Sequence, residues 1–177
     1  MDVRILSETD VSAYYRLRLE GLTLEPRAFG RAAEEYRQES PESVARRVRP
    51  TPGSFTLGAF LDGELVGVMT FVREAGVKTR HKAFVLGVYV TPRARGRGVG
   101  RALLVELITY ARATPGVEQL MLAVSETQAE ARRLYERHGF RVFGREPRAL
   151  KIGDEYVAED HMVMLLSAGV ATGPEYA

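Results

Sequence analysis

The hydrophobic positions of the chain follow two different periods, and each period predicts a type of secondary structure. Alternating or continuous apolar runs predict strands over residues 3–6, 54–61, 64–74, 82–91, 117–124 and 140–143. Apolar residues at helical spacing predict helices between Ser7 and Pro26, after Ser40, over 97–113 and over 128–138. The ranges 147–151 and 156–166 predict a final strand or pair of strands. Residues 29–38 have no clean period, so a loop with helical character is expected there.

Turn residues separate the periodic segments and indicate how the strands connect. Asp62-Gly63 lies between two predicted strands and is the strongest short hairpin signal in the chain, because such turns need residues that tolerate positive φ. A hairpin run of strands is then followed by strand, helix, strand, helix and strand. We therefore expect an α/β (α+β) fold with a mixed, mostly antiparallel central sheet and helices on both faces.

Composition narrows the class of protein. The 177 residues are 45% hydrophobic and 27% charged, as in a soluble globular protein. We expect a single domain over residues 1–166 and a mobile C-terminal tail over 167–177. No apolar run approaches the roughly 20 residues of a membrane span, the N-terminus lacks a secretory signal, and cysteine is absent. A cytoplasmic protein without a membrane partner or thiol chemistry is therefore expected.

The densest chemical signal lies between the apolar run that ends at Val90 and the helix predicted over 97–113. Three glycines alternate with other residues there, and four arginines fall within residues 93–101 with no acidic residue among them. Glycines let backbone N–H groups approach a ligand closely, and a helix N-terminus adds unpaired donors and a partial positive charge. The stretch is therefore expected to bind a polyanion. Nucleic acid is not the expected partner, because the net charge is only +2 and no aromatic residue lies among these arginines.

The spacing of these glycines distinguishes three kinds of phosphate-binding turn. A P-loop needs Gly-Lys-Ser/Thr, which is missing here, and a dinucleotide fingerprint places its third glycine one position later. The stretch instead resembles the acetyl-CoA signature of the GNAT superfamily of N-acetyltransferases, Arg/Gln-x-x-Gly-x-Gly/Ala. It matches that signature at Arg95, Gly98 and Gly100.

A second stretch resembles another motif of the same superfamily, Asn-x-x-Ala-x-x-Leu-Tyr-x-x-x-Gly-Phe. The matching residues are Ala131, Leu134, Tyr135, Gly139 and Phe140. Gln128 departs from the pattern, because it stands where asparagine is usual. The two motifs occur in the family's order, separated by a helix and a strand, and the resemblance covers residues 55–165 as architecture.

This resemblance implies a GNAT-like fold, acetyl-CoA as cosubstrate, and direct transfer of its acetyl group to a primary amine of a small molecule, peptide or protein. It assigns Tyr135 as the acid that protonates the departing CoA thiolate. The residues that it places at acetyl-CoA are Val88, Tyr89, Val90, Arg95, Gly96, Arg97, Gly98, Val99, Gly100, Arg101 and Gln128. Gln128, Tyr135 and either Ala131 or Arg132 lie at helical spacing, so they are expected to share one helix face.

Several choices stay open at this point. The general base is one of Glu34, Glu35, Tyr36, Glu126, His81 or a water chain. His138 is expected to be a surface cation at a helix C-terminus. Residues 81, 138 and 161, the three histidines, lack metal-ligand spacing, so no metal is expected. A non-catalytic acyl-CoA-binding or sensor domain is the alternative function, and the acceptor amine and the choice between monomer and homodimer remain undecided.

Overall fold

The computed structural model of the protein describes residues 1–166, and the tail predicted over 167–177 lies outside the described residues. The strands are β1 (Asp2–Ile5), β2 (Ser54–Leu61), β3 (Glu64–Arg73), β4 (Lys82–Val90), β5 (Gln119–Ser125), β6 (Arg141–Ile152) and β7 (Glu155–Leu165). The α-helices are α1 (Val11–Leu24), α2 (Ala33–Arg37), α3 (Pro41–Val48), α4 (Val99–Ala113) and α5 (Ala129–Arg137). Short 3₁₀ helices are η1 (Glu8–Asp10), η2 (Pro26–Ala28) and η3 (Pro92–Ala94).

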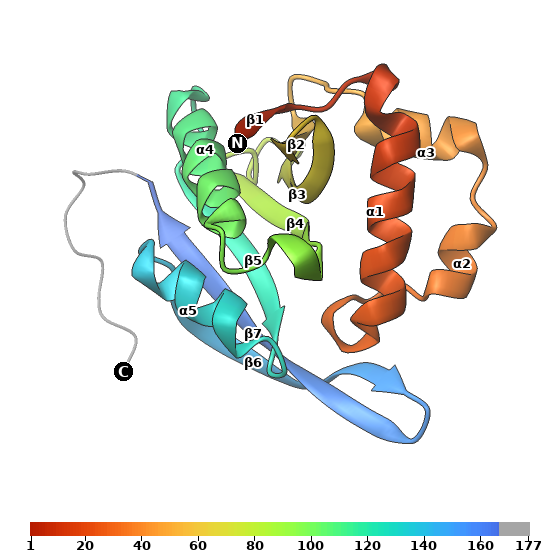
Figure 1. Ribbon diagram of the computed structural model, residues 1–177. Coiled ribbons are helices and arrows are strands. Elements are labelled where there is room, and N and C mark those ends of the chain that lie inside the picture. The colour runs from red at the N-terminus through yellow and green to blue at the C-terminus, as the bar shows by residue number, and fades with distance from the viewer. Residues whose placement is uncertain (167–177) are drawn as a thin grey trace.

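The described strands form one seven-stranded sheet in the order β1-β2-β3-β4-β5-β7-β6 (Figure 1). Every neighbouring pair is antiparallel except β4 and β5, which are parallel. Asp62 and Gly63 form the β2–β3 turn with φ of 50° and 80°, the positive values that a tight hairpin of this kind requires. The mixed, mostly antiparallel sheet and its hairpin are as the sequence predicts.

Helices cover both faces of the sheet, and each face has its own apolar core. On one face α4 buries Leu103, Leu104 and Leu107 against the sheet. On the other face the core includes Tyr36 of α2 and Val44 of α3 with side chains of α1 and of the sheet. Each fully buried leucine contributes roughly 2 kcal/mol to stability relative to an exposed one. Figure 1 shows α4 and α5 on one side and α1, α2 and α3 on the other, so the prediction of helices on both faces is confirmed.

Two helix boundaries differ from the predicted ones. The helix expected from residue 97 begins at Val99, because Gly96 and Gly98 have left-handed backbone conformations with φ of 72° and 78°. The predicted loop over 29–38 contains the five-residue helix α2. Its buried Tyr36 stacks on Tyr15 of α1 with ring centroids 5.1 Å apart, a tertiary contact that sequence periodicity cannot reveal.

The strands expected at 140–143 and 147–151 are one long edge strand, β6. It continues through Pro147, a residue that cannot donate a hydrogen bond to a ladder. The register between β6 and β7 shifts between Glu146 and Leu150, so the proline falls in an irregular part of the strand. Proline would end a central strand. It is tolerated here because β6 is an edge strand and its pairing is irregular at this point.

The central strand β4 diverges from β5 along its length. The two strands pair only where Lys82, Ala83 and Phe84 lie opposite β5 residues 119–121. On its other side, β4 changes register against β3 between Val68 and Thr70, so that Gly87 and Val88 form a bulge. The C-terminal half of β4 therefore has backbone groups that β5 does not pair, and the candidate site lies beside them.

Candidate active site

A cavity of about 530 Å³ lies where β4 ends, between the turn into α4 and the helix α5. It brings together side chains and backbone from both sequence motifs. The predicted site residues that line it are Val88, Tyr89, Val90, Arg95, Gly96, Gly98, Val99, Gly100, Arg101, Gln128 and Tyr135. Arg97 is exposed and is not among the lining residues, so its predicted role stays a prediction.

The turn from β4 into α4 has a backbone conformation that ordinary side chains disfavour. Gly96 and Gly98 both have positive φ, yet a Cβ on either would meet no atom within 4 Å. The glycines are therefore needed for backbone conformation rather than for space. Helix α4 begins directly after Gly98, so its first N–H groups have no partner within the helix. Together, turn and helix end have the geometry expected of an anion-binding cradle.

Two of the arginines around the turn bond to other residues of the protein rather than remaining available to a ligand. Arg95 donates through Nε to the Val90 carbonyl at 3.1 Å and through Nη2 to Glu25 at 2.8 Å. Arg93 pairs with Glu64 at the start of β3. Both acids lie far from the arginines in the sequence, which is why residues 93–101 look like an uncompensated basic stretch when examined alone.

Three other arginines leave positive charge at the cavity. Arg101 extends from the first turn of α4, and Arg133 and Arg137 come from α5. All three are exposed. The motifs did not point to Arg133 and Arg137, although their spacing of four places both on one side of the helix. The cavity therefore combines backbone donors with exposed cations, a combination suited to phosphate groups.

Tyr135 lines the same cavity from α5. Its side chain is 4% exposed, and its ring packs edge-on against Phe140 with centroids 5.8 Å apart. Burial raises the pKa of the phenol above its ordinary value, so the hydroxyl is protonated at neutral pH. A protonated hydroxyl at the cavity wall can donate a hydrogen bond to negative charge that develops there.

Glu25, which follows α1, is a site residue that the motifs missed. One carboxylate oxygen accepts from Arg95, and the other accepts from Gln128 Nε2 at 3.3 Å. The carboxylate thus links the turn after β4 to the start of α5 across the cavity. Gln128, the residue that departs from the family motif, uses its amide for this link.

The candidate bases of α2 and the histidine that precedes β4 lie in different surroundings. Glu34 and Glu35 are exposed on α2, whereas Tyr36 is fully buried. Burial raises the pKa of Tyr36, and its hydroxyl has no hydrogen-bond partner among the described residues. His81 precedes β4 at the end of that strand opposite the glycine turn. About nine residues of extended chain, on the order of 30 Å, separate it from that turn.

Glu126 has a structural role at the end of β5. One of its oxygens accepts the Ala158 N–H at 3.0 Å, and the other pairs with Arg145. The carboxylate therefore ties the β5–α5 connection to β7 and β6. Both of its oxygens are engaged, which leaves Glu126 poorly placed to take a proton from a substrate.

Glu159 of β7 is a candidate base that sequence reasoning missed. It lies opposite Ser125 of β5 and is half-buried. Met162 and Met164 face the α4 core, so strand alternation places Glu159 on the opposite sheet face. Burial raises the pKa of its carboxyl, His161 opposes this rise and Glu146 adds to it. A carboxylate with a raised pKa is a better proton acceptor near neutral pH.

The histidines do not form a metal site. His138 is half-buried rather than a surface residue as predicted, because its Nδ1 is hydrogen-bonded to the Leu134 carbonyl at 2.8 Å. Across residues 1–166, no group of three or more histidine, aspartate and glutamate side chains is arranged to hold a metal ion. The described helices also include none with the length and apolar character needed to span a membrane.

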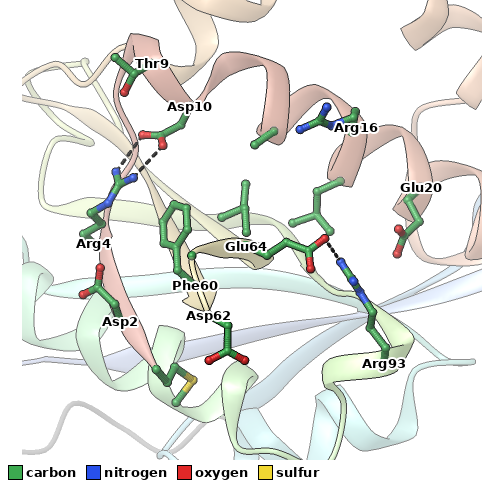
Figure 2. Close-up of a pocket in the computed structure, with 15 residues that line it drawn as sticks. Asp2, Arg4, Thr9, Asp10, Arg16, Glu20, Phe60, Asp62, Glu64 and Arg93 are labelled. Atoms are coloured by element: carbon green, nitrogen blue, oxygen red, sulfur yellow. Dashed lines mark hydrogen bonds and ion pairs between the residues drawn. The ribbon is translucent and has the colours of Figure 1, made fainter.

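A larger cavity of about 1030 Å³ lies at the end of the sheet, beside β1, the start of α1 and the β2–β3 turn (Figure 2). Half of the charged side chains that line it are paired with one another. Arg4 forms two hydrogen bonds with Asp10, at 2.7 and 2.8 Å, and Arg93 pairs with Glu64. Apart from Arg93 of the basic stretch, no predicted site residue lines this cavity, and its lining includes neither the glycine turn nor Tyr135.

Comparisons with known sequences agree with the motifs. The profile of the Acetyltransferase (GNAT) family matches residues 18–140. A mycothiol acetyltransferase of Salinispora arenicola is 37% identical over 123 residues, which cover 67% of this chain and 39% of that protein. The chain thus spans well under half the length of this relative. The L-amino acid N-acetyltransferase AaaT of Escherichia coli is 30% identical over 116 residues, 66% of this chain and 71% of that protein.

Solved structures share the fold over nearly the whole chain. A GCN5-related N-acetyltransferase from Kribbella flavida is 27% identical, with a TM-score of 0.79 and coverage of 93% of this chain and 96% of that one. The yncA protein of Salmonella typhimurium, determined with its cofactor acetyl-CoA, is 22% identical, with a TM-score of 0.83 and 98% coverage of both chains. Because the family profile covers more than half of its residues, the chain belongs to the GNAT acetyltransferase family.

Proposed function

We propose that the protein is an N-acetyltransferase that moves the acetyl group of acetyl-CoA to a primary amine, with residues 1–166 acting as one catalytic domain. One observation carries the proposal: a single cavity holds the glycine cradle, the unpaired half of β4 and the buried, protonated Tyr135. The family membership supports the reaction class, and the name of the relative AaaT supports an amine acceptor.

The residues present fit a long, phosphate-bearing thioester. The turn at Gly96–Gly98 and the α4 N-terminus supply backbone donors for a pyrophosphate, and Arg101, Arg133 and Arg137 add cationic charge. Residues 88–90 lie along the cavity with no ladder to β5, so backbone groups that face away from β3 can pair with an extended amide chain. The Val90 carbonyl already accepts a hydrogen bond from Arg95, which the chain would have to share or displace. Bound acetyl-CoA would supply the acetyl thioester.

Tyr135 is the residue that acts on the leaving group. As the amine nitrogen bonds to the acetyl carbon and the C–S bond breaks, its hydroxyl donates a hydrogen bond to the sulfur. Its raised pKa keeps the proton on oxygen in the resting enzyme. A thiol has a pKa of about 8.5, well below that of the phenol, so the hydroxyl stabilises the thiolate mainly as a donor.

The attacking amine must lose a proton, and Glu159 is the carboxylate best prepared to accept it. It has a raised pKa and lies on the sheet face opposite the α4 core. Glu34 and Glu35 are exposed and Glu126 is engaged by Arg145 and β7. Glu159 does not line the donor cavity, so it would take the proton through a water molecule or from an amine held outside that cavity.

The test is a turnover assay with acetyl-CoA and a panel of amines that includes amino acids, polyamines, aminoglycosides and short peptides. Thiol release that depends on an amine, together with a product one acetyl group heavier, is the expected result. Calorimetry with acetyl-CoA serves as the companion measurement. Binding without thiol release for every amine would contradict the proposal and favour a non-catalytic acyl-CoA-binding domain.

A further inference from the structure

Arg18 of α1 lies between the donor cavity and the bulge of β4. Its guanidinium carbon is 4.3 Å from the ring centre of Phe29, a residue that lines the donor cavity. Toward β4, a Cβ built on Gly87 would lie 3.9 Å from Arg18 Nη1. The guanidinium is therefore next to the bulge at which the unpaired half of β4 begins.

Among residues 1–166, no acidic side chain forms an ion pair with this guanidinium, and one of its nitrogens lacks a hydrogen-bond acceptor. Its Nη1 is buried and has no hydrogen-bond partner among residues 1–166. By contrast, the neighbouring Arg31 and Arg47 share the carboxylate of Glu39. One face of the Arg18 guanidinium stacks on Phe29, but the N–H groups at its edge take no part in this contact. Arg18 is half-buried, and one of its N–H groups is buried without an acceptor, which a negatively charged ligand would supply.

Tyr36 adds a second unused donor. Its side chain is 0% exposed, and its hydroxyl is buried without a partner among the described residues. Tyr36 stacks on Tyr15, which lies three residues before Arg18 on α1 and so on the neighbouring turn of the same helix. In agreement with this placement, Arg18 and Tyr36 each affect the other's pKa. Burial holds the phenol in its protonated form by raising its pKa. A guanidinium edge and a phenol O–H match the two oxygens of a carboxylate.

The part of β4 next to Gly87 has an exposed apolar side chain. Leu86, next to Gly87 on the central strand, is 47% exposed, although central strands are usually covered on both faces. The β6–β7 hairpin reaches the α1–α2 connection, where Arg27 pairs with Glu155 and a Cβ on Gly30 would lie 3.7 Å from Leu150 (Figure 1). The connection and the hairpin are therefore in contact with each other.

We propose that Arg18 and Tyr36 bind a carboxylate on the acceptor, and that the acceptor is an amino carboxylic acid such as an α-amino acid. The inference rests on the proposed acetyl transfer, because it identifies the acceptor of that reaction. An α-amino acid carries its amine and carboxylate on one carbon. A carboxylate held by Arg18 therefore keeps the amine beside Gly87 and Val88, at the start of the donor-binding part of β4. A phosphate dianion is disfavoured, because one guanidinium balances only one negative charge.

The test compares common L-amino acids with their carboxamides as acceptors, which keeps the amine and side chain and removes the negative charge. For the wild-type protein, kcat/KM for the best amino acid is expected to exceed that for its amide by at least tenfold. Arg18→Gln should remove this preference by lowering kcat/KM for the acid while leaving the amide within about twofold. Arg18→Lys, which keeps the charge without the planar fork, should restore part of it. Arg16→Gln, an exposed arginine of the same helix, is the matched control and should keep the wild-type ratio.

Two outcomes separate this inference from the proposed function. Acetylation of amides and acids at equal rates would leave the acetyltransferase proposal standing and overturn the carboxylate site. If no amine is acetylated, calorimetry in the presence of CoA with N-acetyl-L-amino acids and their amides decides the matter. Tighter binding of the acids that Arg18→Gln abolishes would support the site even so, and equal binding would overturn it.

Discussion

Replacing Tyr135 by phenylalanine removes a single hydroxyl from the candidate site. The ring remains packed against Phe140, so the fold and the affinity for acetyl-CoA should change little. A hydrogen bond to a charged group contributes about 1.5–3 kcal/mol. Since each 1.36 kcal/mol corresponds to a tenfold change in rate, the chemical step should slow by about 10- to 150-fold. The upper part of this range is expected, because a side chain that is 4% exposed has little water to substitute for the missing donor.

The assay for Tyr135→Phe is a single-turnover measurement of thiol release, because slow product release can hide a change in the chemical step. Tyr110→Phe is the matched control: Tyr110 lies on α4, is 37% exposed and packs against Phe55 rather than lining the cavity. It should retain the wild-type rate. A Tyr135→Phe rate within a factor of two of wild type, with unchanged acetyl-CoA binding, would refute the assignment of this hydroxyl as the donor.

Three further outcomes test other parts of the structure. Gly98→Ala should weaken acetyl-CoA binding in calorimetry by at least tenfold, because a side chain strains a φ of 78°, whereas Gly144→Ala, in open space on β6, should leave it unchanged. Acetyl-CoA affinity should fall as salt rises from about 50 to 300 mM if the exposed arginines contribute, and a flat salt profile would exclude them. Arg4 holds the pKa of Asp10 at about 2, below its ordinary value, so the pair stabilises the fold above pH 4 and loses this effect as the pH falls toward 2. Asp10→Asn should therefore cost about 1 kcal/mol in urea unfolding at pH 7. That difference should vanish near pH 2, and one that persists there would contradict the ion pair.

The elements of the fold were predictable where local chemistry determines them. The Asp62-Gly63 turn, the helix of α4 and the apolar strands follow from turn propensity and hydrophobic period. Helix α2 was not predictable, because its stability comes from burial of Tyr36 against α1. The length of β6 was missed for a similar reason, since only the sheet edge and the irregular register make room for Pro147.

The candidate site also has residues that the sequence predicts and residues that it does not. Motif residues such as Gly98 and Tyr135 could be placed in one cavity from the sequence, because short segments determine their local geometry. Arg95 looked like a free ligand for phosphate until Glu25, seventy positions away, was found beside it. Arg18 and Glu159 belong to no motif. The roles proposed for them rest on their burial and on their contacts with distant segments of the chain.

The short pairing between β4 and β5 also has a mechanical consequence. Only three residue pairs, at 82–84 and 119–121, join the half-sheet β1–β4 to the half-sheet β5–β7. This seam is the shortest strand pairing of the described sheet, and we expect partial opening to begin along it. A donor whose extended arm bonds to Val88–Val90 lengthens the seam from within. Binding should therefore slow amide hydrogen exchange in the last residues of β4 more than in the β2–β3 hairpin, so that the ligand completes the sheet as an additional strand.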